Sequence, residues 1–152
     1  MKVEHPLYFE DFAEGQVYET ASWTVSEDEI VAFGRKYAPL PYHTDPEAAR
    51  DTSFGTLVAA GYQTAAITFS LFAQTGALTE SGMGSPGVDS LRWKRPVKAG
   101  DTLRVLANIV EVSPAPTDGG RDAVRIRYDT LNQDDDIVMT LTSLHFVRRR
   151  TP

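Results

Sequence analysis

The chain contains no cysteine. Disulfide bonds, thiol nucleophiles and thiolate metal sites are therefore excluded. It also lacks an apolar run long enough for a membrane-spanning helix. Its first residues lack the basic segment followed by an apolar run that marks a secretory signal. We therefore expect a soluble, cytoplasmic protein with no membrane partner.

Basic residues are also in short supply. The chain has 15 Lys and Arg against 21 Asp and Glu, a formal net charge of -6. This balance argues against nucleic acid as a partner. The densest basic run, residues 148–150, is best interpreted as a solvated strand end, with a surface for an anionic ligand as the alternative. The length of 152 residues and the 41% hydrophobic content fit one domain, so we expect a single domain over 1–152.

Several familiar site motifs are missing. The three histidines, His5, His43 and His145, have no spacing typical of a metal site. We expect neither a metal nor a cofactor. His5 is expected in a loose terminus, and His145 is expected to have a structural role. Residues 82–87 match G-x-G-x-x-G formally, but a dinucleotide site needs a strand before the motif and a helix after it. Here a predicted helix precedes the motif and a strand follows it, so we expect a flexible turn between helix and sheet. The acidic run 134–136 lacks the spacing of a calcium loop and is expected at a hairpin tip.

The first half of the chain predicts one strand followed by helices. Residues 16–25 alternate as a strand does. Ser26 and Glu29 form a capping-box pattern that begins a helix. That helix should end near Tyr37, because Pro39 disfavours the helical conformation of the residue before it.

Two further helices are predicted. Asp45 is a suitable N-cap for a short helix, and Pro46 fits its first position. Residues 56–77 carry no charge and are apolar on most sides, which predicts a long, buried central helix.

The second half predicts strands joined by turns, with a proline-rich hairpin connection over 113–118. Such a run indicates an antiparallel sheet. The fold class is therefore α+β, with one long central helix wrapped by a curved antiparallel β-sheet. The strands are expected over residues 90–97, 102–112, 123–133 and 137–149.

The stretch YAPLPYHTDP, residues 37–46, holds a histidine in a stiff setting. His43 follows a Pro-Leu-Pro turn and precedes a capped helix. Gly55 and Gly61 then come at the start of the predicted long helix. Glycine lets a ligand approach the backbone closely, and free N–H groups at a helix start favour a carbonyl oxygen that gains negative charge. A histidine with such a donor suits acid–base chemistry beside a carbonyl. A loop histidine bonded to nearby backbone is the alternative.

These segments resemble the MaoC-like dehydratases, the hot-dog-fold group that contains (R)-specific enoyl-CoA hydratases. The resemblance rests on YAPLPYHTDPEAAR, FGTLVAAGYQTAA, GVDSLRWKRPVKAGDTLRV and the closing VMTLTSLHFVRRR. The first segment is the specific one, since the others would fit hot-dog thioesterases almost as well. The resemblance implies the hot-dog fold and a homodimer or higher homo-oligomer. It also implies an acyl-CoA or acyl-carrier-protein thioester substrate from fatty acid metabolism.

The resemblance also implies a reaction, in which water adds across the double bond of a 2-enoyl thioester or leaves in reverse. His43 matches the family histidine, which activates the water together with an aspartate. Gly61 matches the glycine whose N–H receives the thioester carbonyl. The family aspartate lies five residues before the histidine, where this chain has Ala38.

The alanine leaves three explanations open: an engineered replacement, a natural variant with weak or altered chemistry, or another carboxylate in the role. Asp45 is better used as a helix cap, Glu47 is expected in solvent, and the facing of Asp89 is not fixed by the sequence. Tyr37 and Tyr42 are poor bases at neutral pH and are expected to pack around the turn.

Two other functions stay open beside a hydratase or dehydratase. A hot-dog thioesterase generally uses a carboxylate from the long helix, but residues 56–77 contain no Asp or Glu. A non-catalytic acyl-thioester-binding protein would fit Ala38. The basic residues of segment 92–98 could meet phosphates or form a solvated strand face; they are Arg92, Lys94, Arg95 and Lys98.

Overall fold

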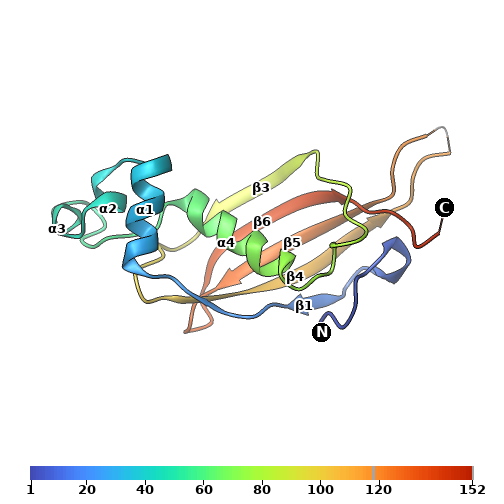
Figure 1. The fold of residues 1–152 in the computed structure, drawn as a ribbon, viewed down its shortest axis with the longest axis horizontal. Helices are drawn as coiled ribbons and strands as arrows, with labels where there is room; N and C mark the ends of the chain where they lie inside the picture. The colour runs from blue at the N-terminus through green and yellow to red at the C-terminus, as the bar shows by residue number, and fades with distance from the viewer. Residues whose placement is uncertain (118, 152) are drawn as a thin grey trace.

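A computed structural model describes residues 1–117 and 119–151 of the chain. A six-stranded antiparallel sheet carries the helix α4 across one face (Figure 1). The strand order is β1-β4-β5-β6-β3, and β2 also pairs with β4. The strands are β1 (Val17–Glu19), β2 (Trp23–Thr24), β3 (Gly87–Trp93), β4 (Thr102–Ser113), β5 (Ala123–Leu131) and β6 (Ile137–Phe146). The helices are the 3-10 turn η1 (Phe9–Asp11), α1 (Glu27–Tyr37), α2 (Pro41–Thr44), α3 (Pro46–Ala49) and α4 (Gly61–Ala73).

The predicted α+β class is confirmed. Strands β4, β5 and β6 follow the predicted segments, and on β5 Val124, Ile126 and Tyr128 are buried while the residues between them are partly exposed. The single strand predicted over 16–25 is divided into β1 and β2, which both pair with β4. The connection predicted over 113–118 joins β4 to β5, with Asp118 outside the described residues.

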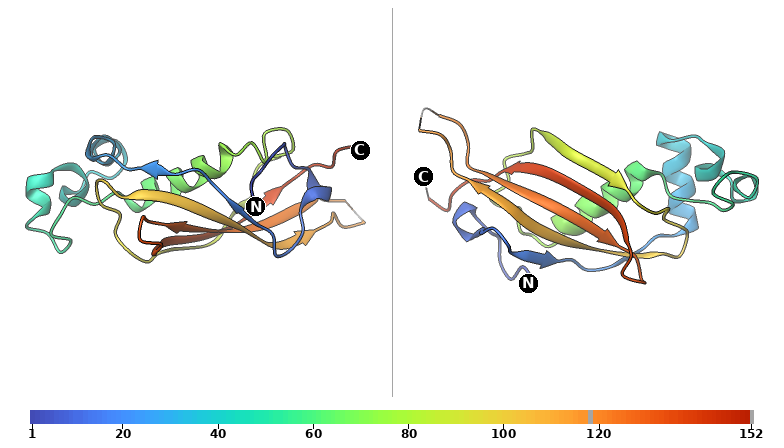
Figure 2. Two further views of the ribbon diagram at one scale, coloured as in Figure 1. Left: turned by 90° about the horizontal axis from the view of Figure 1, so that it is seen from below. Right: turned by 180° about the vertical axis from the view of Figure 1, so that it is seen from behind.

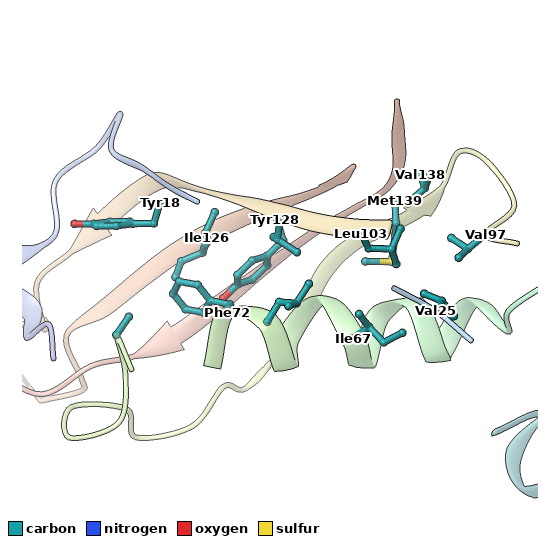
Figure 3. Packing of buried hydrophobic residues seen from close by; sticks show 14 of the residues in the cluster. Tyr18, Val25, Ile67, Phe72, Val97, Leu103, Ile126, Tyr128, Val138 and Met139 are labelled. Atoms are coloured by element: carbon teal, nitrogen blue, oxygen red, sulfur yellow. The ribbon is translucent and has the colours of Figure 1, made fainter. Parts of the chain in front are cut away.

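The core lies between α4 and the sheet (Figure 3). Ile67 and Phe72 of α4 are buried against it, and the Phe72 ring meets the Tyr128 ring edge-on at 5.2 Å between centroids. The hydroxyls of Thr68 on α4 and Thr130 on β5 are 2.7 Å apart. Burying a large apolar side chain contributes about 1.5–3 kcal/mol, so this contact fixes the helix on the sheet.

The prediction that the central helix starts at residue 56 is wrong, because α4 begins only at Gly61. The backbone before it is paired elsewhere: Val58 forms a β-bridge with Lys98, and the Ala59 N–H donates to the Val97 carbonyl at 2.8 Å. The prediction of a helix buried all round also fails for this single chain, since Tyr62 is 70% exposed.

Helices α1, α2 and α3 gather beyond one end of the sheet (Figure 2). Ser26 caps α1 as predicted, accepting from the Glu29 N–H, and α1 ends at Tyr37. The Glu29 carboxylate does not return the bond to the backbone; it accepts from the Trp23 indole and the Ser26 hydroxyl. No helix in the described part of the chain is long and apolar enough to cross a membrane.

Candidate active site

His43 lies in a short helix, α2, where the sequence predicted a stiff turn. Pro41 occupies the first turn of α2, and Asp45 caps the following helix α3 as predicted, accepting from two backbone N–H groups. The His43 ring is buried, and its Nδ1 lies 2.7 Å from the Val58 carbonyl oxygen. A carbonyl can only accept, so Nδ1 carries the proton. In the neutral imidazole Nε2 is then free to accept a proton.

A glycine on α1 holds α2 in this place. A Cβ built on Gly34 would lie 2.2 Å from the His43 carbonyl oxygen, so only glycine allows the two helices to come this close. The Val58 N–H also donates to the Tyr42 carbonyl at 2.9 Å. The backbone of His43 is therefore fixed from α1 and from the segment before α4.

Gly61 is the first residue of α4, as expected of a donor at a helix start. Its N–H makes no hydrogen bond to any residue that the structure describes. Its carbonyl accepts from the Trp93 indole N–H at 2.9 Å. A Cβ at this position would lie 2.4 Å from the Trp93 ring, so the packing of Trp93 also requires glycine.

One cavity of about 510 Å³ joins these residues. Its size lies within the range of small-molecule sites. Ala38, His43 and Gly61 all line it, so the position of the missing aspartate faces the same space as the histidine and the helix start. The other lining residues are Leu40, Tyr42, Phe54, Val58, Ala59, Ala60, Tyr62, Thr64, Trp93, Lys94, Arg95, Pro96 and Val97.

No Asp or Glu is among the residues that line this cavity in the described part of the chain. The three carboxylates considered from the sequence lie elsewhere. Asp45 caps α3, Glu47 is exposed, and Asp89 pairs with Arg125. The structure therefore offers no substitute carboxylate from these candidates.

Thr64, which was not predicted from the sequence, is buried and lines the cavity one helical turn after Gly61. Its hydroxyl has no hydrogen-bond partner among the described residues. The i, i+3 spacing from Gly61 would have placed both on one helix face. Of the tyrosines, Tyr42 packs edge-on against His43 with centroids 4.5 Å apart, whereas Tyr37 is exposed and packs on Phe33.

The basic residues of segment 92–98 divide into two groups. Lys94 and Arg95 line the cavity, whereas Arg92 and Lys98 do not. Two residues of the basic run at 148–150 form ion pairs. Arg149 pairs with Asp122, and Arg150 pairs with Asp11 of the N-terminal segment. His5 is exposed, as expected for the terminus.

Comparison with solved structures defines the class of fold. A Mycobacterium tuberculosis protein described as having a double hotdog fold superposes with a TM-score of 0.80 at 18% identity, over 96% of this chain and 45% of that one. This likeness concerns the fold alone. One helix across a curved antiparallel sheet is thus the hot-dog fold, as the sequence resemblance implied.

The family follows from closer matches. A family model described as the MaoC like domain matches residues 11–125. A MaoC-like dehydratase from Rhodospirillum rubrum has 35% identity and a TM-score of 0.88, over 96% of this chain and 99% of that one. An (R)-specific enoyl-CoA hydratase from the same organism is 31% identical over 112 residues, covering 70% of this chain and 72% of its own length. The chain belongs to the MaoC-like domain family.

Proposed function

We propose that the chain binds 2-enoyl or 3-hydroxyacyl thioesters in the cavity of about 510 Å³ and interconverts them slowly by adding or removing water. The observation that carries the proposal is that His43 and the start of α4 at Gly61 border one cavity. The hydratase and dehydratase names of the relatives agree with this chemistry.

The geometry suits each part of the reaction. Water attacks C3, the electron pair of the double bond moves onto the thioester oxygen, and C2 then takes a proton. The lone pair on His43 Nε2 accepts the proton from water, because Nδ1 already carries the proton that it donates to the Val58 carbonyl. The unpartnered N–H of Gly61 is the donor for the enolate oxygen.

Ala38 limits the rate. A positioned acid–base group contributes about 10²- to 10⁴-fold, and the methyl group of alanine contributes none of it. The hydroxyl of Thr64 can hold a water molecule in the cavity, but it is far too weak a base to replace a carboxylate. We therefore expect full thioester binding with turnover well below that of an enzyme with the complete pair.

Crotonyl-CoA tests this proposal. We expect saturable binding and slow loss of the enoyl absorbance, and we expect His43→Gln to abolish the turnover while leaving binding within about threefold, since glutamine keeps a side-chain donor for the Val58 carbonyl. Leu40→Ala, on the same cavity, is the control for a change that leaves the chemistry intact. Turnover that persists in His43→Gln would remove His43 from the mechanism.

A non-catalytic acyl-thioester-binding protein is the second candidate, and Ala38 is the observation that favours it. The same assay separates the two, because a binding protein would saturate with crotonyl-CoA without any conversion. A thioesterase ranks lower, since α4 contains no carboxylate and none lines the cavity among the described residues.

Lys94 and Arg95 support a phosphate-bearing carrier for the acyl group. Both line the cavity, and Arg95 has a loose pairing with Asp136 at 3.8 Å. Cations at the rim of a cavity that takes a thioester fit the phosphates of CoA or of the acyl-carrier-protein arm. No charge-neutral carrier would use them.

We also propose that a second copy covers α4 and the edge strand β3. In the described sheet β3 pairs only with β6, and an open edge is a place where another strand can pair. Tyr62, Ala66 and Phe69 lie on one exposed helical face of α4 beside it, with Phe69 50% exposed. A two-fold axis would place this apolar surface against its own copy.

We expect light scattering to give a dimer for the native chain. Ala66→Lys places a charge on that face, and burying it without a partner should weaken the dimer about tenfold or more. Gln74→Lys, exposed at the end of α4, is the matched control and should stay dimeric. A native chain that is monomeric at all accessible concentrations would contradict the proposal.

A further inference from the structure

A second cavity, of about 470 Å³, lies at the other end of α4 from Gly61. It is bordered by the last turns of α4, by the connection after α4 and by β3 and β6. Most of its wall is apolar, and none of its lining residues is charged. They are Phe69, Phe72, Ala73, Leu78, Thr79, Gly82, Gly84, Ser85, Val88, Leu141, Ser143, His145 and Phe146.

Two polar side chains of β6 interrupt this apolar wall. Ser143 and His145 are two residues apart on the strand and therefore face the same side of the sheet. The His145 Nε2 lies 2.8 Å from the Tyr128 hydroxyl and 2.9 Å from the Ser143 hydroxyl. His145 is only 6% exposed, and its ring stacks on Phe69.

The hydrogen-bond pattern fixes the proton of His145. The buried Tyr128 hydroxyl has no other acceptor among the described residues, and donation to Nε2 is the arrangement that gives its proton a partner. Burial lowers the pKa of His145 to about 4, so the ring is neutral at physiological pH. A neutral imidazole that accepts at Nε2 carries its proton on Nδ1.

The Nδ1–H donor has no partner among the residues that the structure describes. Among the described residues the one fully buried side-chain atom without a partner is Gln63 Oε1, so His145 Nδ1 is not sealed in the core but is accessible from the cavity that its ring lines. The Ser143 hydroxyl shares Nε2 with Tyr128, so its proton is also able to turn toward the cavity. The apolar cavity thus offers the Nδ1–H donor of His145, which has no partner among the described residues, and the Ser143 hydroxyl, whose acceptor Nε2 is shared with Tyr128.

We propose that this cavity binds an apolar chain that carries a neutral oxygen substituent, a hydroxyl or a carbonyl, paired with His145 Nδ1–H and the Ser143 hydroxyl. A carboxylate is disfavoured, because no cation lines the cavity to compensate its charge. The apolar body of the ligand packs against Phe72 and Leu141, and Phe69, on the face of α4 that a second copy is proposed to cover, borders the cavity beside them.

The ligand is the far end of the acyl group whose thioester sits at Gly61, an assignment that rests on the proposed function. Phe69 lies eight residues along α4 from Gly61, which corresponds to about 12 Å of helix. A medium-length acyl chain spans such a distance. A separate lipid alcohol has the same chemistry, and the binding of decanol distinguishes the two sources.

Calorimetry with paired ligands tests the proposal. Decanoyl-CoA is compared with decanoyl-CoA that carries a hydroxyl on its terminal carbon. We expect the hydroxylated ligand to bind about three- to tenfold more tightly, the value of one or two net hydrogen bonds. Ser143→Ala and His145→Phe should remove this preference, so that each variant binds the two thioesters equally tightly. Thr142→Val, on the same strand but the opposite face, should keep it.

Decanol added to protein saturated with crotonyl-CoA identifies the source of the ligand. Binding of decanol that Ser143→Ala weakens, without a hydroxyl preference among the thioesters, would assign the cavity to a separate molecule and overturn the acyl assignment. Ser143→Ala leaves the Tyr128–His145 pair in place, so a folding defect in His145→Phe would not obscure the result.

The remaining outcomes separate this inference from the proposed function. Binding of thioesters with no hydroxyl preference and no decanol binding would overturn the inference alone. Decanol binding that depends on Ser143, in a protein that binds no thioester, would overturn the proposed function and retain the polar cavity.

Discussion

Replacing Ala38 by aspartate is expected to raise the turnover of crotonyl-CoA by about 10²- to 10⁴-fold. Ala38 borders the cavity that contains His43, and among the described residues no carboxylate already lines it. The added group would take up the water beside Nε2 and complete an acid–base pair. The measurement is the initial rate of loss of the enoyl absorbance at saturating substrate.

Ala38→Asp needs little rearrangement of the fold. The residue ends α1 in a non-helical conformation, half-buried, and its N–H donates to the Gly34 carbonyl. A carboxylate at a helix C-terminus costs about 0.3–1 kcal/mol, and the basic residues Arg35 and Lys36 in the last turn offset part of it. We therefore expect a nearly unchanged melting temperature.

Leu40→Asp is the matched control, since it adds the same charge to another part of the cavity wall. It should not raise turnover. Adding His43→Gln to Ala38→Asp should remove the gain and leave a rate no higher than that of the native chain, because the carboxylate then has no partner. A folded Ala38→Asp protein that binds crotonyl-CoA but turns it over no faster would show that position 38 is not where the missing group belongs.

The sequence predicted what depends on local pattern. Ser26 and Asp45 are helix caps because their side chains satisfy N–H groups two and three residues away. The alternation of Val124, Ile126 and Tyr128 predicted the buried face of β5 because successive strand residues face opposite ways. Such signals lie within a few residues of the position that they decide.

Features that depend on distant partners could not be predicted. The composition of residues 56–60 is compatible with a helix, but Val58 and Ala59 pair with backbone near residue 97, so the helix starts later. For His145 the sequence predicted a structural histidine and gave no sign that its ring is buried beside a second cavity. The register places His145 opposite Val124 and Tyr128 opposite Leu141, so the hydrogen bond between the His145 and Tyr128 side chains runs along the sheet and no local pattern encodes it.

In the candidate site, too, some features could be predicted from the sequence and others depend on distant partners. The spacing of Ala38, His43 and Gly61 was evident from the family resemblance, and the structure places all three around one cavity. The contribution of Gly34 was not evident, because its reason is the approach of a second helix. A glycine within a helix is normally a cost of about 1 kcal/mol relative to alanine.

Gly34→Ala is therefore expected to destabilise the protein although it improves the helix propensity of α1. The new Cβ would lie 2.2 Å from the His43 carbonyl oxygen, which is backbone and cannot rotate away. Overpacking of this kind costs about 1–3 kcal/mol, which exceeds the propensity gain. Thermal denaturation should show a melting temperature lower by a few degrees.

The same substitution should also move His43, and this separates it from a purely structural change. A misplacement of about 1 Å can cost about 10²-fold in rate, so Gly34→Ala in the Ala38→Asp background should lose turnover out of proportion to its stability. Arg35→Ala is the control, since it changes the next, exposed residue of α1 and should keep both properties. A Gly34→Ala protein that melts higher and retains its rate would mean that α2 is not held by its contact with α1.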